Sequence, residues 1–104
     1  MAIDRIAYFS ALVDEAPDEP RARYGLALAL RQADRWDQAA EQYRAYLAMA
    51  TDEGAAYGHL AECLAALGDV EGAADAYLVG MDAALHHGHD GLAADFQAAL
   101  EALN

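Results

Sequence analysis

Histidines gather near the end of the chain in the stretch LHHGHD, where His86, His87 and His89 are followed directly by Asp90. Imidazole nitrogens and carboxylate oxygens are ligands for zinc and nickel, so this stretch could hold a metal ion. If helical, however, His86 and His87 point about 100° apart, and Gly88 is typical of a break between helices. Imidazoles at a helix C-terminus are also favoured by the helix dipole. We therefore predict a helix end with no metal and no cofactor, and a metal carrier is the less favoured alternative.

The only cysteine, Cys63, follows His59 by four residues, a spacing that puts both side chains on one helix face. A thiol beside an imidazole could act as a nucleophile. A buried, inert thiol explains the same residues, and the chain has no glycine-rich phosphate loop and no Gly-x-Ser-x-Gly elbow. We therefore predict that the protein is not an enzyme. A single cysteine also excludes an internal disulfide, which fits a cytoplasmic location.

The charge of the chain is negative and unevenly distributed. The formal net charge is −12, which argues against nucleic acid and anionic membrane surfaces as partners. No run of 18 apolar residues could span a membrane, and the N-terminal segment lacks the pattern of a signal peptide. All six arginines lie between Arg5 and Arg44, whereas residues 45–104 hold ten acidic residues and no Arg or Lys. Two interpretations stay open: acidity that serves solubility or a salt-rich or GC-rich source, and an acidic surface that meets a basic partner.

The sequence repeats itself at an offset of 34 residues, and a period of this kind decides the fold. The paired positions are Leu26 and Leu60, Ala27 and Ala61, Leu30 and Leu64, Trp36 and Val70, Ala39 and Ala73, Ala40 and Ala74, Tyr43 and Tyr77, and Leu47 and Met81. Each unit has an apolar stripe at helical spacing, a break, and a second stripe. Gly68 suits the left-handed end of one helix, and Asp69 suits the cap of the next. Asp90 is predicted to cap a closing helix.

Helices are therefore predicted near residues 3–15, 20–33, 36–50, 54–67, 70–87 and 90–103, with no sheet. Two alanines precede each repeated tyrosine, at Ala39 and Ala40 and at Ala73 and Ala74. We interpret these alanines as the place where the second helix of a unit approaches the first closely, with Tyr43 or Tyr77 filling the space beside them. The motif thus predicts packing and carries no chemistry.

The repeat resembles the tetratricopeptide repeat family, and the layout is similar to that of small bacterial members. The first full unit supplies the family pattern at Arg23, Leu26, Ala27, Leu30, Asp34, Trp36, Ala39, Tyr43, Tyr46 and Thr51. The second supplies it at Tyr57, Leu60, Ala61, Leu64, Gly68, Val70, Ala73, Tyr77, Gly80 and Leu85. Departures are Arg23 for an early aromatic residue, Asp34 for the turn glycine, Tyr46 for a small residue, and no late proline after either unit.

The resemblance implies an all-α, right-handed α-solenoid of antiparallel helix pairs in a single domain, residues 1–104. Within it we expect a half repeat at 3–17, full repeats at 20–53 and 54–87, and a capping helix at 90–103. It also implies a non-enzymatic scaffold that binds a peptide or protein segment in a concave groove. By repeat phase, that groove should include Tyr24, Leu28, Arg31, Gln32, Gly58, His59, Glu62 and Ala65.

The family also has a carboxylate-clamp mode, which uses Lys, Arg or Asn on the first helices. No such residue stands at the equivalent positions, which are Tyr24, Leu28, Ala55, Gly58 and His59. We therefore do not expect a terminal carboxylate as the ligand. The expected partner is a protein or peptide, with basic residues if the acidic surface is the one that meets it. The alternative function is structural self-association as a weak homodimer through Tyr8 and its neighbours, because Ile3–Ala16 carries too many apolar side chains for one face.

Overall fold

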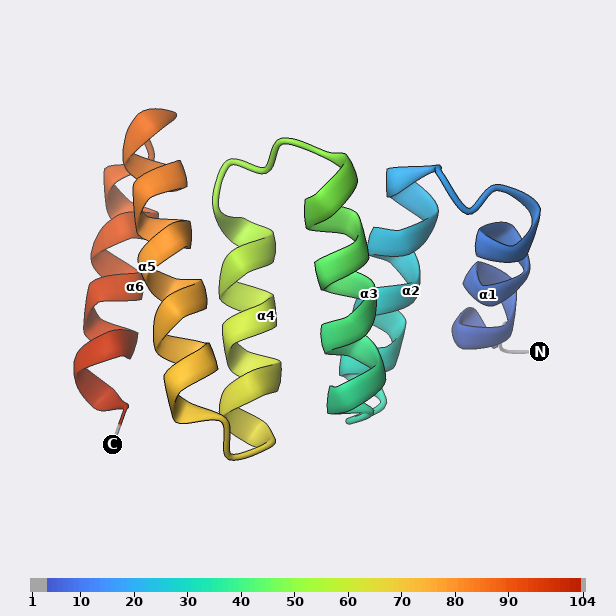
Figure 1. The fold of residues 1–104 in the computed structure, drawn as a ribbon, viewed down its shortest axis with the longest axis horizontal. Helices are drawn as coiled ribbons and strands as arrows, with labels where there is room; N and C mark the ends of the chain where they lie inside the picture. Colours follow the sequence, from blue (N-terminus) through green and yellow to red (C-terminus); the bar gives the residue numbers. More distant parts are fainter. Residues whose placement is uncertain (1–3, 104) are drawn as a thin grey trace. The chain divides into compact units, whose positions relative to one another are not determined.

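The computed structural model describes residues 4–103, and every regular element in that range is an α-helix. The chain divides into two compact units, Met1–Ala50 (unit 1) and Thr51–Asn104 (unit 2). Unit 1 contains α1 (Arg5–Glu15), α2 (Pro20–Gln32) and α3 (Trp36–Met49). Unit 2 contains α4 (Ala55–Ala66), α5 (Val70–His86) and α6 (Asp90–Ala102) (Figure 1). The six predicted helices are confirmed, and Ile3, the predicted start of the first, lies outside the described residues.

Short turns reverse the chain between α2 and α3, α4 and α5, and α5 and α6. Each turn residue has a left-handed backbone: Asp34 with φ 59°, Gly68 with φ 83° and Gly88 with φ 76°. The next residue donates its N–H to the carbonyl five residues back, as Arg35 does to Leu30 at 2.9 Å. This bond satisfies a carbonyl that the helix end would otherwise leave open. Asp34 thus takes the conformation for which the resemblance expects glycine.

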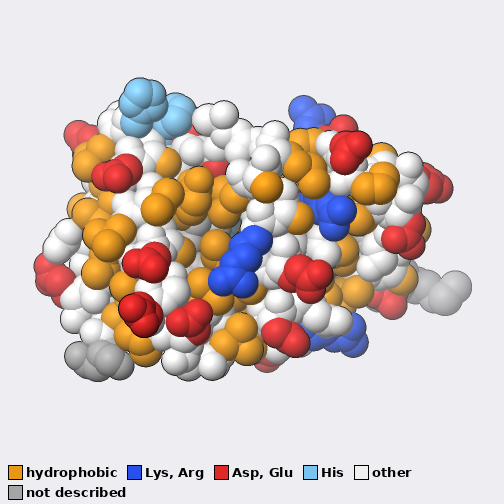
Figure 2. Space-filling view, in the orientation of Figure 1, with side chains coloured by type: hydrophobic (Ala, Val, Ile, Leu, Met, Phe, Trp, Pro, Cys, Tyr) orange, Lys and Arg blue, Asp and Glu red, His pale blue; other side chains and the backbone are white. Residues whose placement is uncertain are grey.

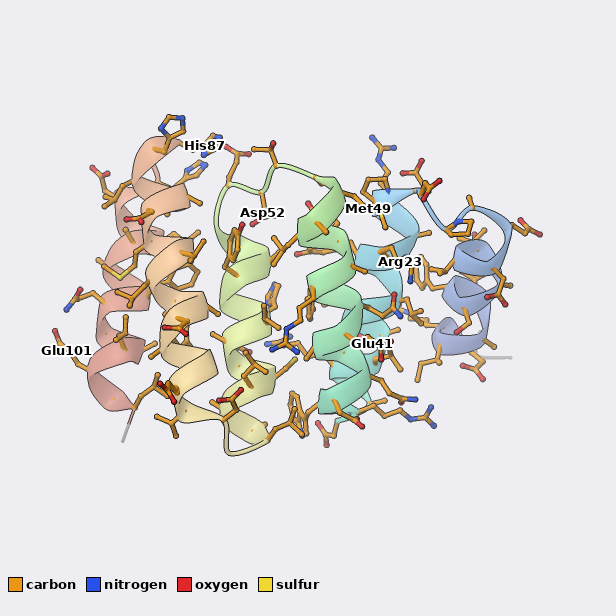
Figure 3. The ribbon with its side chains drawn as sticks, in the orientation of Figure 1. Arg23, Glu41, Met49, Asp52, His87 and Glu101 are labelled. Carbon is orange, nitrogen blue, oxygen red and sulfur yellow. The ribbon has the colours of Figure 1, made fainter. Side chains whose placement is uncertain are left out.

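Side-chain caps start several helices. Asp69 accepts a hydrogen bond from the Gly72 N–H at 2.9 Å, as predicted. Asp52, at the loop before α4, accepts bonds from the N–H groups of Gly54 and Ala56 at 2.8 and 3.0 Å (Figure 3). The prediction for Asp90 is wrong, because His89 is the capping residue and Asp90 is the first residue of α6. In the turn at Gly88, the His89 N–H donates to the Ala84 carbonyl. The His89 carbonyl then accepts the first hydrogen bond of α6, from the Ala93 N–H.

The core of unit 1 lies where α3 meets α2. Ala39 and Ala40 are buried, and Tyr43 beside them has an exposed fraction of 0%. Arg23, which occupies the early aromatic position of the repeat, links three parts of this unit. Its Nη1 donates to Gln42 Oε1 of α3 at 3.0 Å, and its Nε donates to the Pro17 carbonyl at 3.2 Å (Figure 3). The guanidinium therefore ties the α1–α2 loop to α3, a task that an aromatic ring could not perform.

The core of unit 2 follows the same plan, with buried alanines beside a buried tyrosine. Ala61, Ala73 and Ala84 are fully buried, as small residues at helix crossings must be. The Tyr77 ring packs against Phe96 of α6, with ring centroids 5.6 Å apart. The prediction for Ala74 needs correction, because this residue is only half-buried. It follows Ala73 directly, so its side chain points well round the helix from the core.

Candidate functional site

A cleft of about 290 Å³ lies between α1 and α2 in unit 1. Its lining residues are Arg5, Tyr8 and Phe9 of α1 and Gly25, Leu28, Ala29 and Gln32 of α2. Gly25 allows this arrangement, because a Cβ atom there would come within 2.6 Å of Phe9 Cδ1. The Phe9 ring therefore lies directly on the backbone of α2 and forms a wall of the cleft.

Two of the four predicted groove residues in unit 1 line this cleft, namely Leu28 and Gln32. Tyr24 does not line it, because its ring meets rings of α3 edge to face. The centroid distances are 5.9 Å to Tyr43 and 4.9 Å to Tyr46. Arg31 is half-buried and also lies outside the lining of the cleft. Of the four predicted residues in unit 1, only Leu28 and Gln32 therefore share one cleft.

A second cleft of about 290 Å³ lies within unit 2, and three helices line it. The lining residues are Ala55, Gly58, His59 and Glu62 of α4, Tyr77 of α5, and Leu92, Asp95, Phe96 and Ala99 of α6. We call it the unit 2 cleft. A Cβ atom on Gly58 would lie 2.7 Å from Phe96 Cζ, so only glycine lets the ring approach α4 this closely. Of the predicted residues, Gly58, His59 and Glu62 line the cleft, whereas the half-buried Ala65 does not.

Sequence reasoning missed the contribution of α6 to the unit 2 cleft. Leu92 and Phe96 follow Gly58 and Glu62 by the repeat offset of 34 residues. Extending the register into the closing helix would have identified both positions. The same extension shows that Leu28, Glu62 and Phe96 are equivalent positions filled by different residue types, so the chemistry of the face changes along the chain.

The unit 2 cleft combines an apolar wall with carboxylates. Glu62 and Asp95 are exposed on opposite helices, α4 and α6, and the rings of Tyr77 and Phe96 are buried between them. Burial raises the pKa of Tyr77 above its ordinary value of 10.0, and the negative charge of Glu62 raises it further. Residues 51–104 hold no Arg or Lys, so the local charge of unit 2 is predominantly negative. The cleft is suited to an apolar group with a positive charge beside it.

The histidine stretch is divided between several contacts in unit 2. The His87 Nδ1 atom lies 2.9 Å from the Ala83 carbonyl, and the His86 and His87 ring centroids are 5.2 Å apart (Figure 3). The His89 Nε2 atom lies 2.9 Å from Glu53 Oε1. That hydrogen bond, together with the positive charge of His89, lowers the pKa of Glu53 from its ordinary value of 4.5. Among residues 4–103, no three His, Cys, Asp or Glu side chains are grouped to hold a metal ion.

Cys63, on α4, is fully buried and takes part in no disulfide bond. Its helical neighbour His59 is half-buried and lines the cleft.

No helix within the described part of the chain has the length and apolar character needed to cross a bilayer.

Comparisons with known proteins agree with this architecture. A family model described as Tetratricopeptide repeat matches residues 6–53 and residues 27–85. Among solved structures, the chain is similar to PcrH in the crystal structure of its complex with the chaperone binding region of PopD. The TM-score is 0.85 and the identity is 30%, over 93% of this chain and 74% of that one. No curated protein gives a significant match to the sequence.

Proposed function

The chain belongs to the tetratricopeptide repeat family, and from this premise we propose a non-enzymatic module that binds a protein segment in the unit 2 cleft. One observation carries the proposal: Glu62 and Asp95 flank buried aromatic rings in a cleft that contains no Arg or Lys. PcrH, the similar protein, was crystallised with a region of another protein, which supports a protein as the partner class. The partner segment that fits best has an apolar anchor followed by Lys or Arg.

The apolar anchor would supply most of the binding free energy in this arrangement. Interface energy concentrates in a few buried anchors, and the Phe96 wall offers one such pocket. Exposed ion pairs to Glu62 or Asp95 would each contribute only about 0–1 kcal/mol. Charge would instead set the orientation of the segment and the rate of encounter. A chain-terminal carboxylate is a poor candidate for the same cleft, because it would meet these two carboxylates.

The test uses three peptides with one shared apolar anchor, flanked by Lys, by Ser or by Glu. Each is titrated against the full chain by fluorescence anisotropy at low and high salt. We expect the Lys-flanked peptide to bind most tightly and to weaken as salt increases. Changing Glu62→Gln and Asp95→Asn together should reduce its affinity by up to about thirtyfold, the sum of two exposed pairs. Equal binding of the Glu-flanked peptide, or affinity independent of salt, would refute the basic-partner proposal.

The α1–α2 cleft favours a second candidate function, weak self-association. Tyr8 has an exposed fraction of 55% and stands at the edge of this cleft, next to Phe9, with a ring centroid distance of 5.1 Å. An exposed aromatic ring beside an apolar cleft is a typical anchor-and-pocket pair for a homodimer. Sedimentation velocity of the parent and of Tyr8→Ser decides the question. A parent that remains monomeric at high micromolar concentration would exclude this function.

A further inference from the structure

Helix α5 carries a row of apolar side chains that the core of unit 2 does not use. Val70, Leu78 and Leu85 have exposed fractions of 38%, 50% and 54%. Ala74 and Met81 stand between them and are half-buried. The five residues follow one another at spacings of four, four, three and four, so they lie on one side of the helix. We call this set the outer row.

The outer row is separate from the buried side of α5. The core side consists of Ala73, Ala76, Tyr77, Gly80 and Ala84, and all of them are buried. From Ala74 to Leu85 the outer row has the 4-3-4 spacing of a coiled-coil seam. The whole outer row, from Val70 to Leu85, extends over about 22 Å of helix at about 1.5 Å per residue. A seam of this length matches a partner helix of about four turns.

Carboxylates accompany the outer row along its length. Glu71, Asp75 and Asp82 are exposed, and each directly follows a member of the row, namely Val70, Ala74 or Met81. Figure 2 shows acidic and hydrophobic side chains next to one another over α5. No Arg or Lys occurs in residues 51–104, so unit 2 has no guanidinium or ammonium side chain to pair with them. The helix therefore presents an apolar row with an acidic row beside it.

We propose that the outer row binds an amphipathic helix of a partner protein, one with an apolar row flanked by Lys or Arg. The apolar rows would interdigitate, and the basic side chains would meet Glu71, Asp75 and Asp82. Charge excludes a second copy of this chain as the occupant, because pairing α5 with α5 would place these carboxylates against one another. This surface is additional to the unit 2 cleft, since none of its residues lines that cleft.

The probe is a synthetic amphipathic helix with leucines at 4-3-4 spacing and Lys at the flanking positions, compared with a Glu-flanked version. Both are titrated against the full chain by fluorescence anisotropy. We expect the Lys-flanked helix to bind more tightly than the Glu-flanked one, with affinity that falls as salt increases. The double variant Leu78→Ser, Leu85→Ser should lose about tenfold or more in affinity. The double variant Asp75→Asn, Asp82→Asn should lose a few-fold and show a weaker salt dependence.

Matched controls use residues off the outer row. Val79→Ser changes an equally exposed side chain of α5, at 48%, which lies off the row. Glu101→Gln removes an exposed carboxylate of α6. Neither control should alter binding of the Lys-flanked helix, and circular dichroism melts confirm that every variant folds. Equal binding of the two probes, or full binding to the Leu78→Ser, Leu85→Ser variant, would overturn the proposal.

A separate measurement distinguishes this surface from the unit 2 cleft. The Leu78→Ser, Leu85→Ser variant is also titrated with the Lys-flanked cleft peptide, and its affinity should equal that of the parent. Loss of both ligands together would show one site and would overturn the proposal of two. Sedimentation of the parent and this variant completes the test. A parent dimer that dissociates on the double change would assign the outer row to self-association instead.

Discussion

Single glycines decide how closely the helices of unit 2 approach one another. Gly58 and Gly80 both face the Phe96 ring, from α4 and from α5. A Cβ atom on Gly80 would lie 2.9 Å from both Phe96 Cε2 and Tyr57 Cβ, closer than side chains tolerate. Phe96 of α6 can therefore be buried against α4 and α5 only because each of these helices has a glycine at the contact.

We expect Gly58→Ala to destabilise the protein by about 1–3 kcal/mol, as overpacking usually does, despite the higher helix propensity of alanine. In a Phe96→Leu background the same change should cost less or become favourable, because the ring that it overlaps is gone. Thermal or urea unfolding of the four proteins measures this coupling.

The matched control is Gly91→Ala, since nothing lies within 4 Å of a Cβ atom there. That change should leave stability unchanged or raise it slightly. Additive effects of Gly58→Ala and Phe96→Leu would contradict the predicted contact.

The turns between helices differ in the backbone strain of their left-handed residues. Asp34 and Gly68 occupy the same position of the repeat, with φ of 59° and 83°. Only glycine adopts this region without a steric cost, although Asp tolerates it better than most residues. The first turn is therefore strained relative to the second, while the hydrogen bonding of the two is alike.

Asp34→Gly should raise the free energy of unfolding by up to about 1 kcal/mol, and Gly68→Ala should lower it by about 1–2 kcal/mol. Nothing lies within 4 Å of a Cβ atom on Gly68, so backbone strain alone produces the second effect. Chemical denaturation of both variants gives the two signs. Two changes of the same sign would show that the turns are not equivalent.

An ion pair joins the loop before α4 to the start of α6. The pKa of Glu53 is lowered chiefly by its hydrogen bond with His89, so the folded state favours the carboxylate. Its stabilising contribution is present above the ordinary value of 4.5 and is lost as the pH falls through the lowered pKa. The melting temperature of Glu53→Gln should therefore lie slightly below that of the parent near pH 6 and converge with it under acid conditions. A difference that persists or grows at the lowest pH would contradict this assignment.

For the whole molecule, charge is the dominant property. A net charge of −12 on 104 residues makes the chain repel itself, and exposed carboxylates far outnumber basic groups in unit 2. Added salt screens the repulsion between exposed charges that are farther apart than a Debye length, which is about 10 Å at 0.1 M. Salt should consequently stabilise the fold while it weakens the binding of a basic partner.

We expect the melting temperature of the parent to increase between low and moderate concentrations of sodium chloride. The melting temperature of the variant Asp75→Asn, Asp82→Asn should increase less over the same range. Both carboxylates are exposed and lie seven residues apart on one side of α5, so neutralising them removes part of the repulsion. Differential scanning calorimetry across a salt series measures the slope. A melting temperature that falls with salt would mean that attractive ion pairs outweigh the self-repulsion.

The sequence by itself determined the helices, the turns and the family. The 34-residue register depends on residue spacing along one chain, and that spacing directly sets which side chains share a helix face. Gly68 and Asp69 could be assigned from the same reasoning, since left-handed ends and caps are local features. Asp90 was assigned wrongly because the exact start of α6 depends on how the preceding turn closes, at Gly88 and His89.

Only the tertiary structure decided which side chains line a cleft. Tyr24 and Leu28 are one helical turn apart, yet Leu28 lines the α1–α2 cleft while Tyr24 packs on rings of α3. Phe96 completes the unit 2 cleft because Gly58 and Gly80 leave space for its ring. This contact involves residues of three different helices. Helical phase is a property of consecutive residues, whereas a cleft depends on the distance between helices, and that distance is set by the sizes of side chains far apart in the sequence.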